Sequence, residues 1–382
     1  MGSHSSGSGN RRVAPWVIVV AVIAALVVIV VIGMVWLGGV SDRQGEQAAQ
    51  QCVRGDAQVP VVATPELAEP LKRVALAFNA TRDITDDYCV SVTVTDMPAA
   101  TVLTGLVGQW GTGPRPALWV PQSTVWSARL QVATPAALSG APTSLVTSPV
   151  LLAVRSPLAR SLDGVAWVDV PVLQGPRGLA RRAPGWGGLR LALPTGDDSD
   201  ATYLAAQSIA AGVAHAVGPI ADSVARGPQV GTTLARLASG APKARPETTV
   251  DALNALAAQK DPKAGAIHAV PVTEQELYAY TAAHPDSGIV GVALSGGTAS
   301  ATFPAVSLDD QSLSDAQTHG AADFVTFLGR DANARPLAAA GFRVPDQPTP
   351  KATAAVAFAT VEPLPAPSVA ALTAIADAVT TE

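Results

Sequence analysis

The sequence has few of the residues on which most enzymatic and nucleic-acid-binding sites depend. Charged residues make up 14% of its 382 positions, aromatic residues make up 4%, and there are 5 histidines. No two histidines have the spacing of metal ligands, and no G-x-S-x-G, P-loop, G-x-G-x-x-G or H-E-x-x-H motif occurs. A net charge of -5, with no basic cluster outside the N-terminal region, argues against nucleic acid as a partner. We therefore expect a protein that is not an enzyme and that holds no metal or cofactor.

Residues 13–37 form one long hydrophobic run. From Val17 to Leu37 the chain has no charge and no proline, and at about 1.5 Å per residue a helix of this length spans a ~30 Å hydrocarbon core. Arg11 and Arg12 precede the run, which favours a cytoplasmic N-terminus and an extracytoplasmic remainder. A cleaved signal peptide is the alternative, but the run is longer than a typical signal-peptide core and no small-x-small cleavage site ending in alanine follows closely. We predict an uncleaved signal anchor in the lipid bilayer of the cell membrane.

Only two cysteines occur, Cys52 and Cys89, and both follow the predicted anchor. An even count in an oxidising compartment favours one disulfide, and two unrelated thiols are the alternative. In the chain-entropy model, a disulfide that closes a loop of this length would stabilise the fold by roughly 3–4 kcal/mol.

Beyond the anchor the pattern predicts strands that alternate with helices. Residues 59–63, 89–95 and 116–120 are short apolar or alternating runs, and each is followed by a helical pattern. Three such units in succession imply an α/β fold with a parallel sheet covered by helices. Further strands are expected at residues 144–154, 189–193, 265–270, 289–294 and 300–308, and further helices at residues 99–110, 232–237, 248–259, 320–328 and 332–340.

Hydroxyl side chains recur where a predicted strand ends and a helix begins. They are Thr64, Ser123, Thr195, Ser199 and Thr273. In an open α/β sheet these ends converge on a crevice, and free N–H groups at helix starts suit an anionic or hydroxyl-rich ligand. The alternative is that they are only helix caps, as the pairing of Thr273 with an acid three residues later suggests.

Residues 197–200, with the sequence DDSD, could attract a cation. A calcium loop needs a longer series of ligands, and an acidic helix start explains the segment more simply. We therefore assign no metal here.

The order of these segments resembles the type 2 periplasmic (extracellular solute-) binding protein fold, from about residue 59 to 345. The strings that carry the resemblance are VVATPELAEPLKRVALAFN, PALWVPQSTVWSARL, SLVTSPVLLAV, LALPTGDDSDATYLAA and AIHAVPVTEQELYAY. The run AADFVTFLGRDANARPLAAAGFRVPD is similar to the usual ending of such domains. More narrowly, the chain resembles actinobacterial membrane-anchored proteins that carry such a domain followed by a von Willebrand factor A domain.

The resemblance implies two lobes around a cleft, joined by crossing strands at residues 144–154 and near 289–308. It adds Ser148 to the hydroxyl residues of the expected cleft rim. We expect no von Willebrand factor A domain in this chain, and metal-dependent adhesion is not carried over. The expected division of the chain is residues 1–12 as a disordered cytoplasmic tail, 13–37 as the transmembrane anchor, 38–56 as a stalk, 57–147 with 296–345 as lobe 1, 148–295 as lobe 2, and 346–382 as a Pro-rich C-terminal tail.

Two functions remain open at this point. The first is a tethered protein that binds an unknown small-molecule ligand between its lobes, for transport or sensing. The second is a non-catalytic scaffold with a vestigial binding-protein fold that holds a membrane or cell-envelope protein partner. The first needs hinge closure around a ligand and no catalytic group, which fits the sequence, so we expect ligand binding. One feature favours the second, because the expected rim offers hydroxyls but few charged or aromatic groups. A hydrolase is disfavoured because no nucleophile–base pair is evident. Stabilisation by a ligand would separate the first two functions.

Overall fold

The structure is a computed structural model that describes residues 52–111, 113–197, 199–243 and 246–380, with short helical pieces at 26–28, 30–31 and 34. The predicted anchor over residues 13–37 lies mostly outside the described residues. Apolar side chains in these pieces, from Leu26 to Met34, are 53–70% exposed. Among the described residues, no helix is both long enough and apolar enough to cross a membrane.

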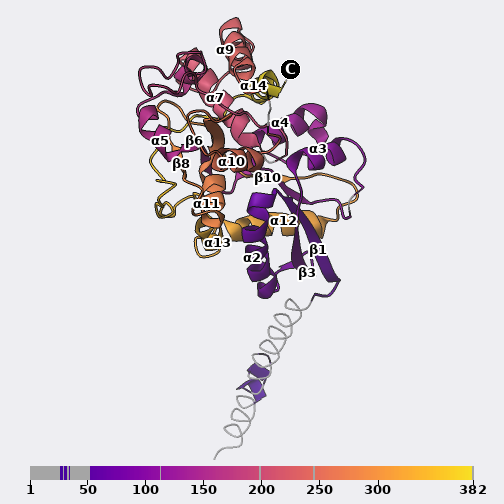
Figure 1. Ribbon diagram of the computed structural model, residues 1–382. Coiled ribbons are helices and arrows are strands. Elements are labelled where there is room, and N and C mark those ends of the chain that lie inside the picture. The colour runs from indigo at the N-terminus through magenta and orange to yellow at the C-terminus, as the bar shows by residue number, and fades with distance from the viewer. Residues whose placement is uncertain are drawn as a thin grey trace, which may run out of the picture.

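Lobe 1 is built on a six-stranded sheet with the order β2-β3-β1-β4-β10-β5. Figure 1 labels β1, β3 and β10 of this sheet. β1 pairs in parallel with β3 and β4, as the strand–helix pattern predicts, whereas β10 is antiparallel to β4 and β5. The strands are β1 (Gly55–Ala63), β2 (Ile84–Thr85), β3 (Tyr88–Asp96), β4 (Leu118–Val120), β5 (Thr143–Ser144) and β10 (Pro304–Ser307). The helices are α2 (Pro65–Thr81), α3 (Ala99–Val107), α4 (Thr124–Ala133), α12 (Asp315–Leu328) and α13 (Arg335–Ala339).

Lobe 2 is built on an antiparallel sheet with the order β7-β6-β8, and β9 also pairs with β6. β6 is its central strand, and seven of its eight residues are buried, which explains its continuous apolar sequence. The strands are β6 (Ser148–Arg155), β7 (Ala269–Thr273), β8 (Ile289–Val292) and β9 (Ser300–Ala301). The helices are α5 (Ser156–Ala159), α6 (Val170–Leu173), α7 (Asp200–Ala214), α8 (Asp222–Ala225), α9 (Pro228–Ser239), α10 (Thr249–Ala257) and α11 (Glu274–Ala283).

Two strand predictions in lobe 2 are wrong. The four apolar residues of 189–193 are buried, but the segment makes only an isolated bridge, Leu191 with Ala269, among the described residues. Hydrophobicity therefore predicted the burial but not the absence of continuous strand pairing. The strand predicted at 265–270 instead runs from Ala269 to Thr273 and includes Pro271. Proline is tolerated there because β7 lies at the edge of its sheet.

The two segments that connect the lobes lie side by side. In lobe 1, Ser144 of β5 pairs with Pro304 of β10, and in lobe 2, Ser148 of β6 pairs with Ala301 of β9. The chain therefore passes between the lobes on two adjacent antiparallel segments. This arrangement is typical of a hinge, because two short connections can absorb a change in the angle between rigid bodies.

The C-terminal segment packs against both lobes rather than extending away from them. Val356 is fully buried, and the ring of Phe358 lies 5.7 Å from that of Tyr278 on α11. The segment ends in α14 (Val369–Thr380), which contacts α4 of lobe 1 and α7, α8 and α9 of lobe 2. In Figure 1 α14 accordingly lies beside α4, α7 and α9. Residues 346–380 thus make a third connection between the lobes.

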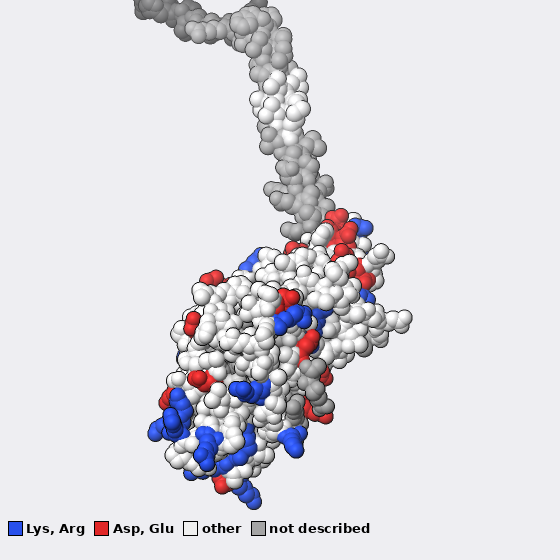
Figure 2. Space-filling view, turned by 90° about the horizontal axis from the view of Figure 1, so that it is seen from above, with Lys and Arg blue, Asp and Glu red and all other residues white. Residues whose placement is uncertain are grey.

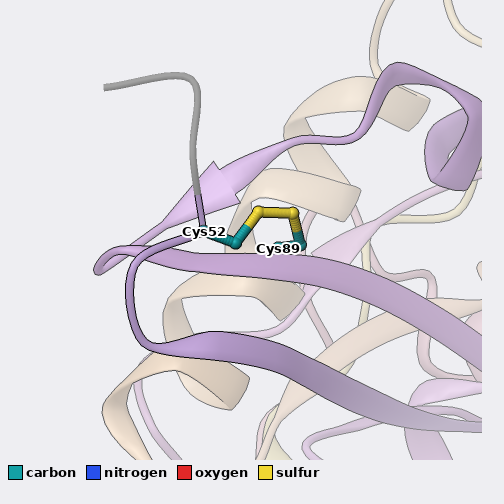
Figure 3. The surroundings of a disulfide bond; sticks show 2 residues. All are labelled: Cys52 and Cys89. Carbon is teal, nitrogen blue, oxygen red and sulfur yellow. A yellow bond between two sulfur atoms is a disulfide. The ribbon is translucent and has the colours of Figure 1, made fainter. Parts of the chain in front are cut away.

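The predicted disulfide is confirmed. Cys52 and Cys89 are bonded, with their Cα atoms 5.1 Å apart and 37 positions apart in sequence (Figure 3). Cys89 lies in β3, so the bond fixes the start of the described domain to the lobe 1 sheet. The loop that it closes contains β1 and α2.

Most of the face in Figure 2 carries no charge, as a content of 14% charged residues implies. Lys and Arg side chains gather at one end of this face, and Asp and Glu side chains are more frequent toward the other. Within lobe 2, the irregular segment between β6 and α7 carries four exposed arginines, which are Arg160, Arg177, Arg181 and Arg182.

Candidate ligand cleft

Gln122 joins the starts of three helices from the two lobes. Its Nε2 donates to Glu66 Oε1 of α2 at 2.6 Å and to Glu276 Oε1 of α11 at 3.0 Å. Its Oε1 accepts a hydrogen bond from the backbone N–H of Asp200, at the start of α7, at 3.2 Å. Gln122 itself directly precedes Ser123, the N-cap of α4, and is 1% exposed. The expected convergence of helix starts therefore occurs, around a residue that the sequence analysis did not select.

Asp200 makes the closest polar contact between the lobes. Its carboxylate accepts from Ser123 Oγ at 2.5 Å and from Trp126 Nε1 at 2.8 and 2.9 Å. The side chain is 2% exposed, and this burial raises its pKa from 3.8 to about 6. A carboxylate of lobe 2 is therefore held by two side chains of lobe 1, from the N-cap and the first turn of α4.

Four of the six predicted rim residues make hydrogen bonds within the protein. Ser123 binds Asp200, and Ser148 Oγ accepts from the N–H of Gln275 at 2.9 Å. Ser199 Oγ accepts from the N–H of Thr249 at 3.2 Å, which links α7 to α10. The fourth is Thr273, whose role is the predicted capping box.

The capping box of α11 is confirmed. Thr273 Oγ1 accepts from the N–H of Glu276 at 3.2 Å, and a Glu276 carboxylate oxygen accepts from the N–H of Thr273 at 2.7 Å. Burial raises the pKa of Glu276 from 4.5 to about 7, although its hydrogen bonds with Thr273 and Gln122 oppose the shift. The proximity of Asp200 adds to the rise.

The remaining two predicted residues behave differently. Thr64 is fully buried at the N-cap of α2, and its hydroxyl has no hydrogen-bond partner among the described residues. Thr195 is half-buried in the loop that leads to α7. The structure thus brings Ser123 and Thr273 to the residues around Gln122, and it uses Ser148 and Ser199 to join elements within lobe 2.

A groove of about 420 Å³ opens between the lobes next to Gln122. We call it the interlobe groove, and its lining comes from the start of α2 in lobe 1 and from α10 and α11 in lobe 2. The lining residues are Pro65, Glu66, Thr249, Val250, Leu253, Gln275, Glu276, Ala279, Tyr280 and His284. A second hollow of about 550 Å³ also borders Tyr280 and His284, so the depression continues along α10 and α11. Sequence reasoning missed this lining because it looked for hydroxyls at strand ends.

No group of three or more His, Cys, Asp or Glu side chains able to hold a metal occurs within the described part of the chain. Asp198, in the acidic segment before α7, lies outside the described residues. One string, DQSLS from Asp310 to Ser314, does match the D-x-S-x-S pattern of von Willebrand factor A metal sites. Here Asp310 forms an ion pair with Arg115 at 2.8 Å, and Ser314 is the N-cap of α12. The string therefore has a structural role.

Comparison with known proteins decides the family. Residues 59–343 match the bacterial extracellular solute-binding protein family. The chain belongs to this family. A domain of this family is extracytoplasmic, which agrees with the orientation expected from the sequence. Two uncharacterized proteins, from two strains of Mycobacterium tuberculosis, are each 35% identical over 353 residues, which is 91% of this chain. The chain spans 51% of the length of these curated relatives.

Solved structures share the two-lobed α/β fold of this solute-binding protein. An iron- and citrate-bound protein from Trichodesmium is 10% identical, covers 85% of this chain and 98% of its own, and has a TM-score of 0.59. A ferric binding protein from Campylobacter jejuni is 9% identical, covers 84% and 97%, and has a TM-score of 0.58. The sulfate-binding protein from Mycobacterium tuberculosis is 16% identical, covers 76% and 88%, and has a TM-score of 0.50. At these identities the likeness concerns the fold alone, and it confirms the two-lobed α/β fold expected from the sequence for the domain after the predicted anchor.

Proposed function

We propose that this protein is a membrane-anchored, non-enzymatic solute-binding protein that holds a small ligand between its lobes. The interlobe groove is the observation that carries the proposal, because its walls come from both lobes. A ligand that touches both walls stabilises the closed arrangement over the open one, which is how binding becomes a signal for transport or sensing. Membership of the solute-binding family supports the same proposal.

The proposed ligand contacts are in the lining of the interlobe groove rather than in the hydroxyls alone. The hydroxyls of Ser123, Ser148, Ser199 and Thr273 make hydrogen bonds within the protein. We propose that they support the site, and that Thr64 and Thr195 contribute to its rim. On this proposal a ligand binds beside Gln122, where Glu66 and Glu276 approach each other.

The proposed anchor rests on the sequence of residues 13–37. Its apolar length suits a bilayer, and the arginines before it favour an extracytoplasmic domain. The proposed relationship to actinobacterial proteins that also carry a von Willebrand factor A domain is supported by the mycobacterial relatives, which are longer than this chain. We do not extend metal-dependent adhesion to this chain.

One set of contacts favours the alternative function of a scaffold for a cell-envelope partner. Arg129 of α4 forms an ion pair with Asp377 of α14 at 3.0 Å and lies over the ring of Tyr203 of α7 at 5.5 Å. Together with Asp200 and α14, this contact joins the two lobes through side chains of the protein itself. A protein whose lobes are joined in this way could present one fixed surface to a partner.

Native mass spectrometry of the full chain purified from its native host tests the proposal. We expect a co-purifying small molecule that raises the melting temperature when added back. A ligand at 100 times its Kd that binds only the folded state stabilises it by about 2.7 kcal/mol. A Val250→Trp variant fills the interlobe groove and should lose the molecule. A chain that carries no small molecule and responds to none in a broad metabolite panel would support the scaffold instead.

A further inference from the structure

The charged side chains of the interlobe groove make their hydrogen bonds within the protein. Glu66 and Glu276 each accept a hydrogen bond from Gln122, and Glu276 also accepts one from the N–H of Thr273. No Lys or Arg is among the described residues that line the groove. An anionic ligand would therefore find no cationic side chain in this lining, and a cationic ligand would compete with Gln122 for the carboxylates.

Two further polar residues of the lining present little surface to a ligand. Thr249 is 2% exposed and Gln275 is 4% exposed. Gln275 bonds to neighbouring segments instead, because its N–H donates to Ser148 Oγ at 2.9 Å and its Nε2 donates to Ala340 O at 3.4 Å. The surface that the groove presents to a ligand is therefore mainly that of its apolar residues.

Apolar side chains form the accessible walls of the groove. Val250, in the first turn of α10, is 55% exposed. Pro65 of α2 and Ala279 of α11 are also exposed and line the same groove. Covering apolar surface is favourable without any charge on the ligand, and a volume of about 420 Å³ is in the range of small-molecule sites. These walls therefore suit a small, uncharged molecule.

An aromatic pair completes the lining. The rings of Tyr280 and His284 are stacked, with their centroids 4.4 Å apart and 24° between their planes. The Tyr280 hydroxyl donates to Asn254 Oδ1 at 3.0 Å, which fixes the orientation of its ring. Because aromatic pairs are stabilised beyond the area that they bury, these rings favour an aromatic ligand.

His284 also supplies a hydrogen-bond acceptor. Its Nδ1 lies 3.0 Å from the carbonyl oxygen of Tyr280, and a carbonyl can only accept, so we assign the proton of the neutral ring to Nδ1. Nε2 then carries a lone pair, and none of the described residues bonds to it. His284 is exposed where it lines the groove, so a ligand with an O–H or N–H group can donate to this atom.

We propose that the interlobe groove binds a small, uncharged aromatic molecule that carries an O–H or N–H donor. Its ring packs against Val250 and Tyr280, and its donor bonds to His284 Nε2. This inference rests on the proposed function and names the ligand class for the same site. It excludes ionic solutes as the ligands of this groove.

Indole and benzofuran test the ligand class, because the two molecules have the same shape and only indole has a donor. Each is titrated by calorimetry into the full chain in mild detergent at pH 8, with the same detergent without protein as the blank. We expect indole to bind about three- to tenfold more tightly than benzofuran, which is the range that one net hydrogen bond supplies. Tryptamine, a cation, and indole-3-acetate, an anion, should each bind more weakly than indole.

Two variants separate the donor contact from the apolar wall. His284→Phe keeps an aromatic ring beside Tyr280 and removes the acceptor, so it should lower the affinity for indole to that for benzofuran and leave benzofuran unchanged. Val250→Asp places a charge in the wall and should weaken both probes by at least about tenfold. The fold is retained, because an acidic side chain is favourable in the first turn of α10.

Val217→Asp is the matched control, since Val217 is fully exposed between α7 and α8. It should bind both probes as the wild type does. If indole binds no better than benzofuran, or if its advantage survives His284→Phe, the inference is overturned. A charged probe that binds more tightly than indole, or failure of all four probes to bind, would overturn it as well.

The proposed function is judged separately by Val250→Trp and the co-purified molecule. If a charged solute co-purifies and Val250→Trp removes it, solute binding in the groove stands and the uncharged aromatic class is wrong. If Val250→Trp leaves every bound solute in place, the groove is not the site and both proposals are wrong.

Discussion

Replacing Asp200 with asparagine should change how the stability of the protein depends on pH. Burial raises the pKa of Asp200 from 3.8 to about 6, so the folded protein binds this proton more tightly than the unfolded chain does. The resulting stabilisation is fully present below pH 3.8 and is lost as the pH rises through 6. An asparagine side chain cannot titrate, so the variant lacks this loss while keeping an acceptor for Ser123 or Trp126.

The linkage relation gives the size of the effect. With pKa values of 3.8 in the unfolded chain and about 6 in the fold, the contribution of Asp200 falls by about 1.4 kcal/mol between pH 5 and pH 7.5. Asp200 also raises the pKa of Glu276, so its removal lowers that pKa and acts in the same direction. The free energy of unfolding of the wild type should therefore fall relative to Asp200→Asn by at least about 1.4 kcal/mol over this range.

Urea unfolding of the full chain in mild detergent, followed by circular dichroism at several pH values, measures this difference. Equal m-values for the two proteins are required, because they show that the same surface is exposed on unfolding. Asp163→Asn, at an exposed position in lobe 2, controls for the loss of a carboxylate. A difference between the wild type and Asp200→Asn that does not change with pH, or that grows in favour of the wild type, would falsify the reasoning.

Three further changes test the packing of the fold. Ile375→Ala removes a fully buried side chain from α14 and should lower the free energy of unfolding by about 2–5 kcal/mol, measured by urea unfolding; a loss below about 1 kcal/mol would mean that α14 is not held between the lobes. Replacing Cys52 and Cys89 together by serine should cost about 3–4 kcal/mol, seen as a lower Tm than the oxidised wild type, and a reductant should then affect only the wild type. Thr273→Ala should lower the free energy of unfolding by about 1 kcal/mol because the helix cap is lost, whereas Thr273→Ser should retain most of that stability. Equal losses for the two variants in urea unfolding would exclude a capping role.

Local sequence signals predicted the parts of the fold that depend on near neighbours. Thr273 and Glu276 are three positions apart, so their capping box could be read directly from the sequence, and the structure has it. β1 and α2 appear where an apolar run gives way to Thr64 and Pro65. The strand predicted at 265–270 shows where local signals fail. The strand continues through Pro271 because β7 lies at the edge of its sheet, and that position is not set by neighbouring residues.

The candidate site could be predicted only in part because its contacts join distant positions. Gln122 bonds to residues 56 and 154 positions away, so nothing near it in sequence distinguished it from the adjacent Ser123. The apolar face of α14, with Leu372, Ile375 and Val379, does have helical spacing and was a usable signal. Its partners on α4 and α7 were not evident, because a helical pattern indicates that a face is buried without saying what covers it.

The sequence by itself determined the strand–helix alternation, the helix caps, the disulfide expected from an even number of cysteines, and the resemblance to the solute-binding family. These features follow from spacing, propensity and composition, which act over a few residues or over the whole chain. Only the tertiary structure decided that Asp200 bonds to Ser123 and Trp126 of the other lobe, that the C-terminal segment joins both lobes, and that two carboxylates meet at Gln122. Each of these depends on the relative placement of two lobes, and that placement is set by packing between segments far apart in sequence.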